Sequence, residues 1–334
     1  SRRAALGRKT CSISFSGCSS GFATWNWQPC CQLPGSATSF YGCWDGRQLR
    51  ELMSEGECVI APGAYDGLTA RLIAQAGFAS VYMTGGGTSS GFGYPDYGLL
   101  TMSEMVENAG RIVDAVDLPV ISDADNGYGN ELNVYRTIQT FEKAGVAGVH
   151  IEDQVFPKKC GHLEDKELVS LEDYLAKIRA AADARRRDDF VIIARTDARA
   201  SLGFEEAARR CRAALQAGAD VAFLEAPQTI DEVSAAPREI WGPCLLNVVR
   251  GGKTPEVTFE QATGFGYAIA IVPGLLLIQA IGACEQVLAA MKEEGRHPVP
   301  LADLSPAQAF AKVGAAEWDP RREKYRTAPA EAAE

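Results

Sequence analysis

The sequence predicts a (β/α)8 barrel, and three observations lead to that prediction. From Cys58 onward, short runs of apolar and β-branched residues alternate eight times with amphipathic stretches of ten or more residues. The apolar runs have no polar face, which is typical of parallel strands that are covered by helices. Polar residues follow at the ends of these runs, where barrel enzymes carry their chemistry. An open, doubly wound sheet is the alternative arrangement of the same units.

The predicted strands are short and are separated by helical patterns. The strands are expected at residues 58–61, 80–84, 119–123, 148–152, 190–195, 220–225, 244–248 and 267–272. Helices between them include residues 103–116, 131–144, 171–184 and 204–217. Gly77, Gly145 and Gly218 each follow an alanine at the end of a helical pattern. Glycine fits the left-handed conformation that commonly ends a helix, so these positions mark helix ends.

The barrel is predicted to occupy residues 45–300, with an extension at either end. The whole chain has 33 Lys and Arg against 43 Asp and Glu, a net charge of −10, yet residues 1–44 contain no acidic residue. This Arg- and Ser-rich stretch has no helical or strand periodicity, so we expect a targeting or poorly ordered extension. An over-long gene start is the alternative. Residues 301–334 are expected to form a C-terminal helical extension and tail.

Composition and patterning also argue against two kinds of partner, nucleic acid and membrane. The acidic balance disfavours nucleic acid, because phosphate binding needs clustered Lys and Arg. Residues 261–284 are uncharged and long enough to suggest a membrane span, but Gly264, Gly266, Pro273 and Gly274 divide them into a short strand and the start of a helix. We therefore expect no membrane partner.

The cysteines after residue 44 are scattered, which indicates a reducing compartment. The cytoplasm is expected, or a mitochondrion or plastid if residues 1–44 are a transit peptide.

Three carboxylates follow neighbouring predicted strands. Asp123 and Asp125 lie in the run DADNGYG at residues 123–129, and alternate residues of an extended chain point the same way. Glu152 ends the next strand. Carboxylates without a His or Cys partner favour a hard ion, Mg²⁺ or Mn²⁺, that is held largely through waters. A turn cap is the alternative role of Asp125.

Two further strand ends suggest anion binding. The run TGGG at residues 84–87 follows the second strand, and a glycine-rich turn lets backbone N–H groups approach a carboxylate or phosphate. Arg195 ends the fifth strand and is suited to bidentate binding of a carboxylate. Asp197 is expected to cap the next helix. We therefore expect a small-molecule carboxylate as substrate.

Residues 154–162 (QVFPKKCGH) form a polar connection that is longer than a typical βα loop. Cys160 lies beside Lys158 and Lys159, which would lower the pKa of the thiol at the barrel mouth. His162 could bind substrate or tune the thiol. A purely structural cysteine is the alternative interpretation.

Five motifs together resemble the isocitrate lyase/phosphoenolpyruvate mutase superfamily, from about residue 47 to about residue 295. They are TGGG at 84–87, GYPD at 93–96, DADNGYG at 123–129, VHIEDQ at 149–154 and KKCGH at 158–162. The resemblance implies a (β/α)8 TIM barrel whose eighth helix is exchanged between subunits. It also implies a homotetramer built as a dimer of dimers.

The same resemblance implies roles for individual residues. Mg²⁺, or Mn²⁺, is expected on Asp123, Asp125 and Glu152, with Asp96 nearby. Substrate binding is expected from Thr84, Gly85, Gly86, Gly161, Arg195, Glu225 and Asn247. Catalytic roles are expected for Cys160, Tyr82, Lys158 and His162, with Cys160 on a loop that closes over the substrate.

The KKCGH loop indicates the lyase branch, because the phosphonate mutases of this superfamily lack it. The short chain resembles the 2-methylisocitrate and dimethylmalate lyases more than the isocitrate lyases, and it also resembles the carboxyvinyl-carboxyphosphonate phosphorylmutase-like proteins.

Two residues bear on the choice of activity. Pro273 stands where related oxaloacetate hydrolases have Ser, which also favours a lyase. Arg250 departs from the pattern that the resemblance implies, and it could alter which substrate carboxylate is accepted.

The expected reaction is a retro-Claisen-type cleavage of a 2-hydroxy di- or tricarboxylate into a 2-oxo acid and a carboxylate. Tyr82 is the expected base, and Cys160 protonates the resulting carbanion. An oxaloacetate hydrolase or decarboxylase, a phosphonate-type mutase acting on carboxyphosphonoenolpyruvate, and a catalytically silent barrel are the alternatives.

Overall fold

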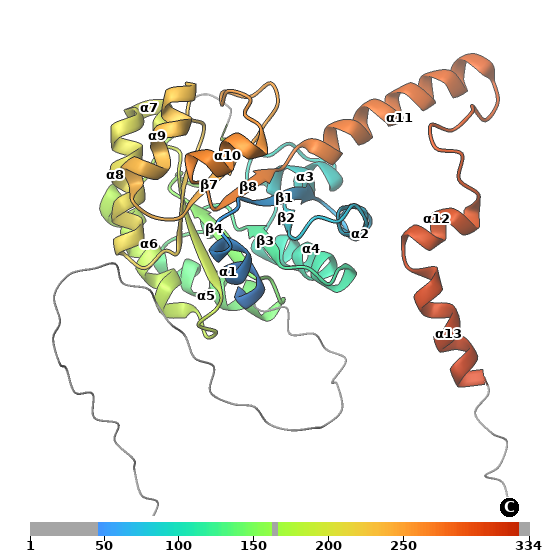
Figure 1. Ribbon diagram of the computed structural model, residues 1–334, viewed down its shortest axis with the longest axis horizontal. Coiled ribbons are helices and arrows are strands. Elements are labelled where there is room, and N and C mark those ends of the chain that lie inside the picture. The colour runs from blue at the N-terminus through green and yellow to red at the C-terminus, as the bar shows by residue number, and fades with distance from the viewer. Residues whose placement is uncertain (1–45, 162–165, 327–334) are drawn as a thin grey trace, which may run out of the picture. The chain divides into compact units, whose positions relative to one another are not determined.

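The eight strands form a closed, fully parallel barrel in the order of the sequence, from β1 to β8 (Figure 1). The computed structural model describes residues 46–161 and 166–326. Strands β1 and β8 close the barrel by pairing Val59 with Ile269 and Pro62 with Val272. The strands are β1 Val59–Ala64, β2 Val81–Met83, β3 Val120–Asp123, β4 Gly148–Glu152, β5 Val191–Thr196, β6 Val221–Leu224, β7 Cys244–Asn247 and β8 Ile269–Val272. The predicted (β/α)8 barrel is confirmed.

The helices from α2 to α10 alternate with the strands and surround the barrel (Figure 1), whereas α1 precedes β1 and α11 to α13 follow β8. The helices are α1 Gly46–Ser54, α2 Gly67–Gln75, α3 Gly85–Gly91, α4 Met102–Ala115, α5 Glu131–Lys143, α6 Leu171–Ala184, α7 Arg199–Leu202, α8 Phe204–Gln216, α9 Ile230–Ile240, α10 Phe259–Phe265, α11 Leu275–Glu294, α12 Pro306–Lys312 and α13 Ala315–Arg326. Gly77, Gly145 and Gly218 follow α2, α5 and α8 with φ angles of 86°, 89° and 112°. These are left-handed conformations, as the sequence predicted.

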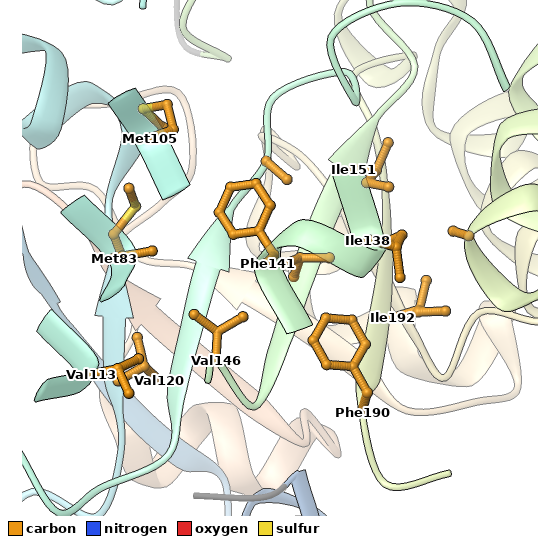
Figure 2. Packing of buried hydrophobic residues seen from close by; sticks show 14 of the residues in the cluster. Met83, Met105, Val113, Val120, Ile138, Phe141, Val146, Ile151, Phe190 and Ile192 are labelled. Atoms are coloured by element: carbon orange, nitrogen blue, oxygen red, sulfur yellow. The ribbon is translucent and has the colours of Figure 1, made fainter. Parts of the chain in front are cut away.

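Apolar side chains are buried in two layers. One fills the barrel interior and includes Tyr82, Ile121, Ile193 and Phe223. The other lies between the strands and the helices that cover them, and Figure 2 shows part of it, including Phe141 of α5. Strands that are buried on both faces carry apolar residues without alternation, which is the pattern that the sequence contained.

Helix α1 packs at the N-terminal ends of the strands. A Cβ atom on Gly46 would lie 2.0 Å from the Asp189 carbonyl oxygen, so only glycine permits this approach. Leu49 is fully buried with the apolar residues of the barrel interior. Arg50 donates from Nε and Nη2 to the carbonyl oxygens of Asp189 and Phe190. These contacts leave the opposite, C-terminal ends of the strands for the site.

Helix α11 differs from the barrel helices, because none of its residues is buried. By length and composition it could span a membrane. It begins after Gly274, so the uncharged residues 261–284 contain the predicted short strand, β8, and the predicted start of a helix, α11, together with the end of α10, which was not predicted. Helices α12 and α13 follow within the predicted C-terminal extension, and the Gln75 side chain of α2 donates to the Lys312 carbonyl oxygen at 2.7 Å. The predicted N-terminal extension, residues 1–44, lies outside the described residues.

Candidate active site

Polar side chains from six successive strands converge at the C-terminal end of the barrel. All are buried, although strand ends of this kind normally face solvent. They are Thr84 after β2, Asp123 and Asp125 at and after β3, Glu152 on β4, Arg195 on β5, Glu225 after β6 and Asn247 on β7. The carboxyl ends of parallel strands meet at one rim, so the sequence-predicted residues come together there.

Lys158 crosses this rim as a buried cation. Its Nζ lies 2.7 Å from Asp96 Oδ1 and 2.8 Å from Asp125 Oδ1. Burial alone would lower the pKa of Lys158, but Asp125 and Asp123 raise it well above its ordinary value, so the side chain stays charged. The charge of Lys158 is therefore directed at two carboxylates, which the sequence did not predict.

A bend brings Asp123 and Asp125 together. Strand β3 ends at Asp123, and Asp125 has a left-handed φ of 47° that non-glycine residues seldom adopt. The Asp125 backbone N–H donates to Asp123 Oδ1 at 2.9 Å. The two carboxylates thus converge through this turn, and the extended-chain alternation inferred from the sequence is not the reason.

The two carboxyl groups differ in acidity. Burial alone would raise the pKa of Asp123, but His150 and Lys158 lower it to about 2. Burial raises the pKa of Asp125 to about 6, although Lys158 opposes the shift. Asp125 is therefore an incompletely compensated carboxylate, and an additional cation at this rim would favour its ionised form.

Glu152 has the least satisfied carboxylate of the rim. Neither of its buried Oε atoms accepts a hydrogen bond, and Arg195 Nη1 lies 3.2 Å from Oε2. Burial raises the pKa of Glu152 well above its ordinary value. In the described ranges, no three His, Cys, Asp or Glu side chains are close enough to chelate a metal directly. An all-oxygen rim with orphaned acceptors fits a hard ion that keeps several waters.

The glycines at residues 85 and 86 begin helix α3, so they do not form an open turn. Thr84 is the N-cap, and its side chain accepts a hydrogen bond from the Gly87 N–H. A Cβ on Gly85 would lie 2.3 Å from Asp123 Oδ2, and one on Gly86 would lie 3.3 Å from Asp96 Oδ2. These glycines therefore make room for two carboxylates, a requirement that the anion-binding interpretation did not include.

Arg195 is held from two sides. Its Nε and Nη2 atoms donate to Asp197 at 2.9 and 3.2 Å, and its guanidinium carbon lies 5.2 Å from the centroid of the Phe223 ring. The expectation that Asp197 caps a helix is wrong, because the N-cap of α7 is Ala198 and no side chain caps it. Asp197 instead fixes the arginine that the sequence predicted as a carboxylate ligand.

His150 is a site residue that the sequence analysis did not identify. Its Nε2 lies 2.7 Å from Tyr82 Oη and 3.5 Å from Asp123 Oδ1. Burial lowers the pKa of His150 to about 4, and burial with Asp123 raises the pKa of Tyr82 well above its ordinary value. Both side chains are therefore neutral near pH 7. Strand periodicity could have identified His150, because it lies two residues before Glu152 on the same strand face.

Cys160 lies on a turn that packs on the rim. The cysteine is partly buried, and a Cβ on the next residue, Gly161, would lie 2.4 Å from Arg195 Nη2 and 2.5 Å from Glu225 Oε1. Asn247 Nδ2 donates to Glu225 at 3.2 and 3.3 Å. The turn therefore brings the thiol to the barrel mouth, whereas His162 lies outside the described residues.

Two sequence departures have different outcomes. Arg250 has a side chain that is 93% exposed and pairs with Glu256 at 3.4 Å, so this structure gives it no contact with the rim residues. Pro273 follows β8 directly, and a Cβ on Gly63 would clash with it. Pro273 thus stands at the strand end where the sequence analysis expected it.

Taken together, the rim defines a (β/α)8-barrel enzyme site with buried carboxylates, a bidentate arginine and a cysteine on an overlying turn. The phosphoenolpyruvate phosphomutase family matches residues 49–292. The chain belongs to this family, within the PEP mutase/isocitrate lyase superfamily, and it is an enzyme. The resemblance inferred from the sequence is confirmed.

The relatives divide among several activities. The chain is 47% identical to 2,3-dimethylmalate lyase of Eubacterium barkeri over 74% of this chain and 86% of that one. It is 43% identical to 2-methylisocitrate lyase of Aeropyrum pernix, over 75% and 80%. A structure of oxaloacetate acetylhydrolase with 3,3-difluorooxalacetate matches with a TM-score of 0.81 and 39% identity, over 86% and 99%. A phosphonopyruvate hydrolase with oxalate and Mg²⁺ matches at 0.75 and 31%, over 85% and 98%.

Proposed function

We propose that this protein is a Mg²⁺-dependent carbon–carbon lyase that cleaves a 2-hydroxy di- or tricarboxylate of the dimethylmalate or 2-methylisocitrate type. The observation that supports this most directly is the packing of the Cys160–Gly161 turn against Arg195 and Glu225. That contact brings the residue next to Cys160 beside the proposed carboxylate-binding residues. The high identity with two lyases agrees with the same reaction class.

The metal is proposed to bind through waters to Asp123, Asp125 and Glu152, with Asp96 nearby. Support comes from the orphaned Glu152 oxygens and from the raised pKa of Asp125. Bound Mg²⁺, or Mn²⁺, would supply a Lewis acid that lowers the pKa of the substrate hydroxyl. Lys158 is proposed to orient Asp96 and Asp125 through its two short contacts.

Two proton transfers complete the proposed cleavage. Tyr82 is a neutral phenol, so it takes the proton of the 2-hydroxyl group while its own proton passes to the neutral imidazole of His150, whose Nε2 lies 2.7 Å away, as the hydroxyl-bearing carbon becomes a ketone. The carbon–carbon bond breaks, its electron pair passes to the carbon of the departing fragment, and the Cys160 S–H protonates that carbon. The products are a 2-oxo acid and a second carboxylate, so no external redox partner is needed.

Anion binding is proposed for the remaining rim residues. Arg195 provides the charge-assisted donors, because Asp197 and Glu152 hold its guanidinium in one orientation. The other proposed substrate-binding residues are Thr84, Gly85, Gly86, Gly161, Glu225 and Asn247. His162 stays a proposed catalytic residue on sequence grounds.

Oxaloacetate hydrolysis is the second candidate. Its support is the similarity to oxaloacetate acetylhydrolase at 39% identity and a TM-score of 0.81. Pro273 directly after β8 favours the lyase, since the family resemblance inferred from the sequence implies Ser at this position in the hydrolases. A phosphonate-type mutase acting on carboxyphosphonoenolpyruvate is less favoured, because the KKCGH loop is present.

A substrate panel combined with Cys160→Ser tests the proposal. Dimethylmalate, 2-methylisocitrate, isocitrate, oxaloacetate and phosphonopyruvate would be assayed with Mg²⁺ and with EDTA. We expect a hydroxy acid to be the best substrate, and Cys160→Ser to lower kcat on it by about 10²–10⁴-fold with little change in KM, because a serine hydroxyl is a much weaker acid. A serine variant with kcat within about threefold of wild type would contradict the general-acid role.

We also propose a homotetramer, with α11 packed against a partner subunit. The support is that α11 exposes large apolar residues along its whole length, among them Ile278, Ile281, Leu288 and Met291. A reducing compartment such as the cytoplasm is proposed as well, because the scattered cysteines Cys58, Cys211, Cys244 and Cys284 are free thiols.

A further inference from the structure

Lys166 joins the cysteine turn to the barrel rim. Its side chain is only 2% exposed, and its Nζ donates to Asp197 Oδ1 at 2.8 Å. The same Nζ donates to the carbonyl oxygen of Gly161, the residue after Cys160. One buried ammonium group therefore connects Asp197, directly after β5, and the turn that carries the thiol.

Asp197 is the fixed end of this connection. Its carboxylate accepts two hydrogen bonds from Arg195, and its backbone N–H donates to Asp153 Oδ1 at 2.9 Å. Asp153 is itself held by Arg210 of α8 at 2.9 Å. Burial alone would raise the pKa of Asp197, but Arg195 and Lys166 lower it below its ordinary value, so it stays an anion. Lys166 thus binds to a rigid, charged support.

The other end of the connection requires close packing. Gly161 approaches Arg195 and Glu225 so closely that no side chain fits between them. Packing excludes a side chain but does not by itself fix the direction of the adjacent thiol. A hydrogen bond to the Gly161 carbonyl oxygen fixes the peptide plane that follows Gly161. Together with the packing of Gly161 against Arg195 and Glu225, it limits the movement of the adjacent Cys160.

We propose that Lys166 is a positioning residue, which holds the Cys160–Gly161 turn against Arg195 through Asp197 and so aligns the thiol with the bound anion. This inference rests on the proposed lyase function for its kinetic consequence, but the placement of the thiol can be measured without any substrate. No residue implied by the sequence resemblance has this role.

Lys166→Met and Lys166→Arg test the proposal through two measurements. The first is the rate at which iodoacetamide alkylates Cys160, followed by mass spectrometry and compared with wild type under the same conditions, with fully buried Cys211 as the reference for the folded state. We expect faster alkylation of Cys160 in the methionine variant, while Cys211 stays unmodified in both proteins. The second is steady-state kinetics, where we expect kcat to fall by about 10²-fold with KM nearly unchanged, because misplacing a catalytic group by an ångström has this order of effect. Arginine, which retains the charge and the donors, should recover part of both.

Arg187→Met is the matched control. Arg187 is also a basic side chain that donates to a backbone carbonyl, that of Val146 at 3.0 Å, and that pairs with carboxylates, but it lies at the opposite end of the strands. The Arg187→Met variant should have a lower melting temperature than wild type, with unchanged kcat and an unchanged rate of Cys160 alkylation. If Lys166→Met does not fold, the same two measurements on Lys166→Gln replace it.

The outcomes separate this inference from the proposed function. Wild-type alkylation of Cys160 in folded Lys166→Met overturns the positioning role, whatever the substrate is. If Cys160→Ser keeps its kcat, the general-acid mechanism fails, but faster alkylation in Lys166→Met would still support the positioning role. If Cys160→Ser is inactive and both Lys166 variants have wild-type kcat, the proposed function stands and the positioning role is wrong.

Discussion

At the scale of single residues, the rim is short of positive charge. Asp96, Asp123, Asp125 and Glu152 surround Lys158, and Arg195 is already paired with Asp197. Buried carboxylates are costly unless a cation or hydrogen bonds compensate them. The orphaned oxygens of Glu152 mark the place where compensation is least complete. A divalent ion at this rim would supply what the protein's own cations do not.

Asp125→Ala is therefore expected to remove metal dependence without unfolding the protein. Lys158 keeps its contact with Asp96, and alanine leaves no orphaned charge in place of the carboxylate. Activity should be lost. In wild type, Mg²⁺ at about a hundred times its Kd should stabilise the fold by about 2.7 kcal/mol, and this stabilisation should be much smaller in the variant. Thermal unfolding with Mg²⁺ and with EDTA measures the difference.

Asp114→Asn is the control for this experiment, because Asp114 is an exposed carboxylate on α4. It should keep both the activity and the Mg²⁺-dependent rise in melting temperature. Wild-type turnover that EDTA leaves untouched would contradict the metal site itself, and normal Mg²⁺ stabilisation in Asp125→Ala would contradict the role of this residue.

At the scale of elements, α3 makes room for the site because its first residue, Gly85, has no side chain. Gly85 and Gly91 stand at its two ends, and neither has a positive φ. A side chain on Gly85 would collide with Asp123, whereas a Cβ on Gly91 would meet nothing within 4 Å. The helix itself would tolerate alanine at either position, because alanine is the better helix former.

The pair Gly85→Ala and Gly91→Ala separates these two effects. Gly85→Ala should lower kcat/KM strongly, because the carboxyl group of Asp123 must move, while the chain stays folded. Gly91→Ala should keep full activity and raise the free energy of unfolding by about 0.5 kcal/mol, since glycine is unfavourable in helices. Kinetics and urea unfolding of the two variants check this. Equal activity in both would show that Asp123 has no fixed position in the reaction.

At the scale of the whole molecule, α11 is an apolar helix that is largely exposed within the described ranges. Leu276 near its start packs against the barrel core, but no residue of α11 is buried. Monomeric proteins seldom leave so large a continuous apolar surface in water. Packing against a second copy of the chain would cover this surface, which is the basis of the proposed tetramer.

Ile281→Lys combined with Leu288→Lys is expected to dissociate the assembly into smaller species. Both side chains are exposed apolar residues of α11, and a lysine at each would have to be desolvated in an interface. Light scattering after size-exclusion chromatography gives the molar mass. Gln286→Lys adds the same charge at an exposed polar position of the helix and should leave the mass unchanged. A wild-type protein that is monomeric at micromolar concentration would contradict the proposal.

The sequence by itself determined the barrel and the rim that carries the site. Eight apolar runs and the left-handed glycines after helices are local patterns, and they fix strands, helix ends and therefore which residues stand at the C-terminal ends of strands. Asp123, Glu152 and Arg195 could be predicted as neighbours because parallel strands meet at a common rim. The predicted strand boundaries differ from the observed ones by three residues at most, and β4 has the predicted bounds.

Only the tertiary structure decided how these residues pair. Lys158 turns to Asp96, which lies 62 residues away in the chain, and Asp197 binds Lys166, which lies 31 residues away. No local pattern encodes such distances, because side-chain direction depends on how loops pack across the rim. The same holds for Gly85, which is required by the carboxylate of Asp123, and for Gly46, which is required by the carbonyl of Asp189. Periodicity assigns a residue to an end or a face of the barrel, whereas burial and charge in three dimensions select its partner.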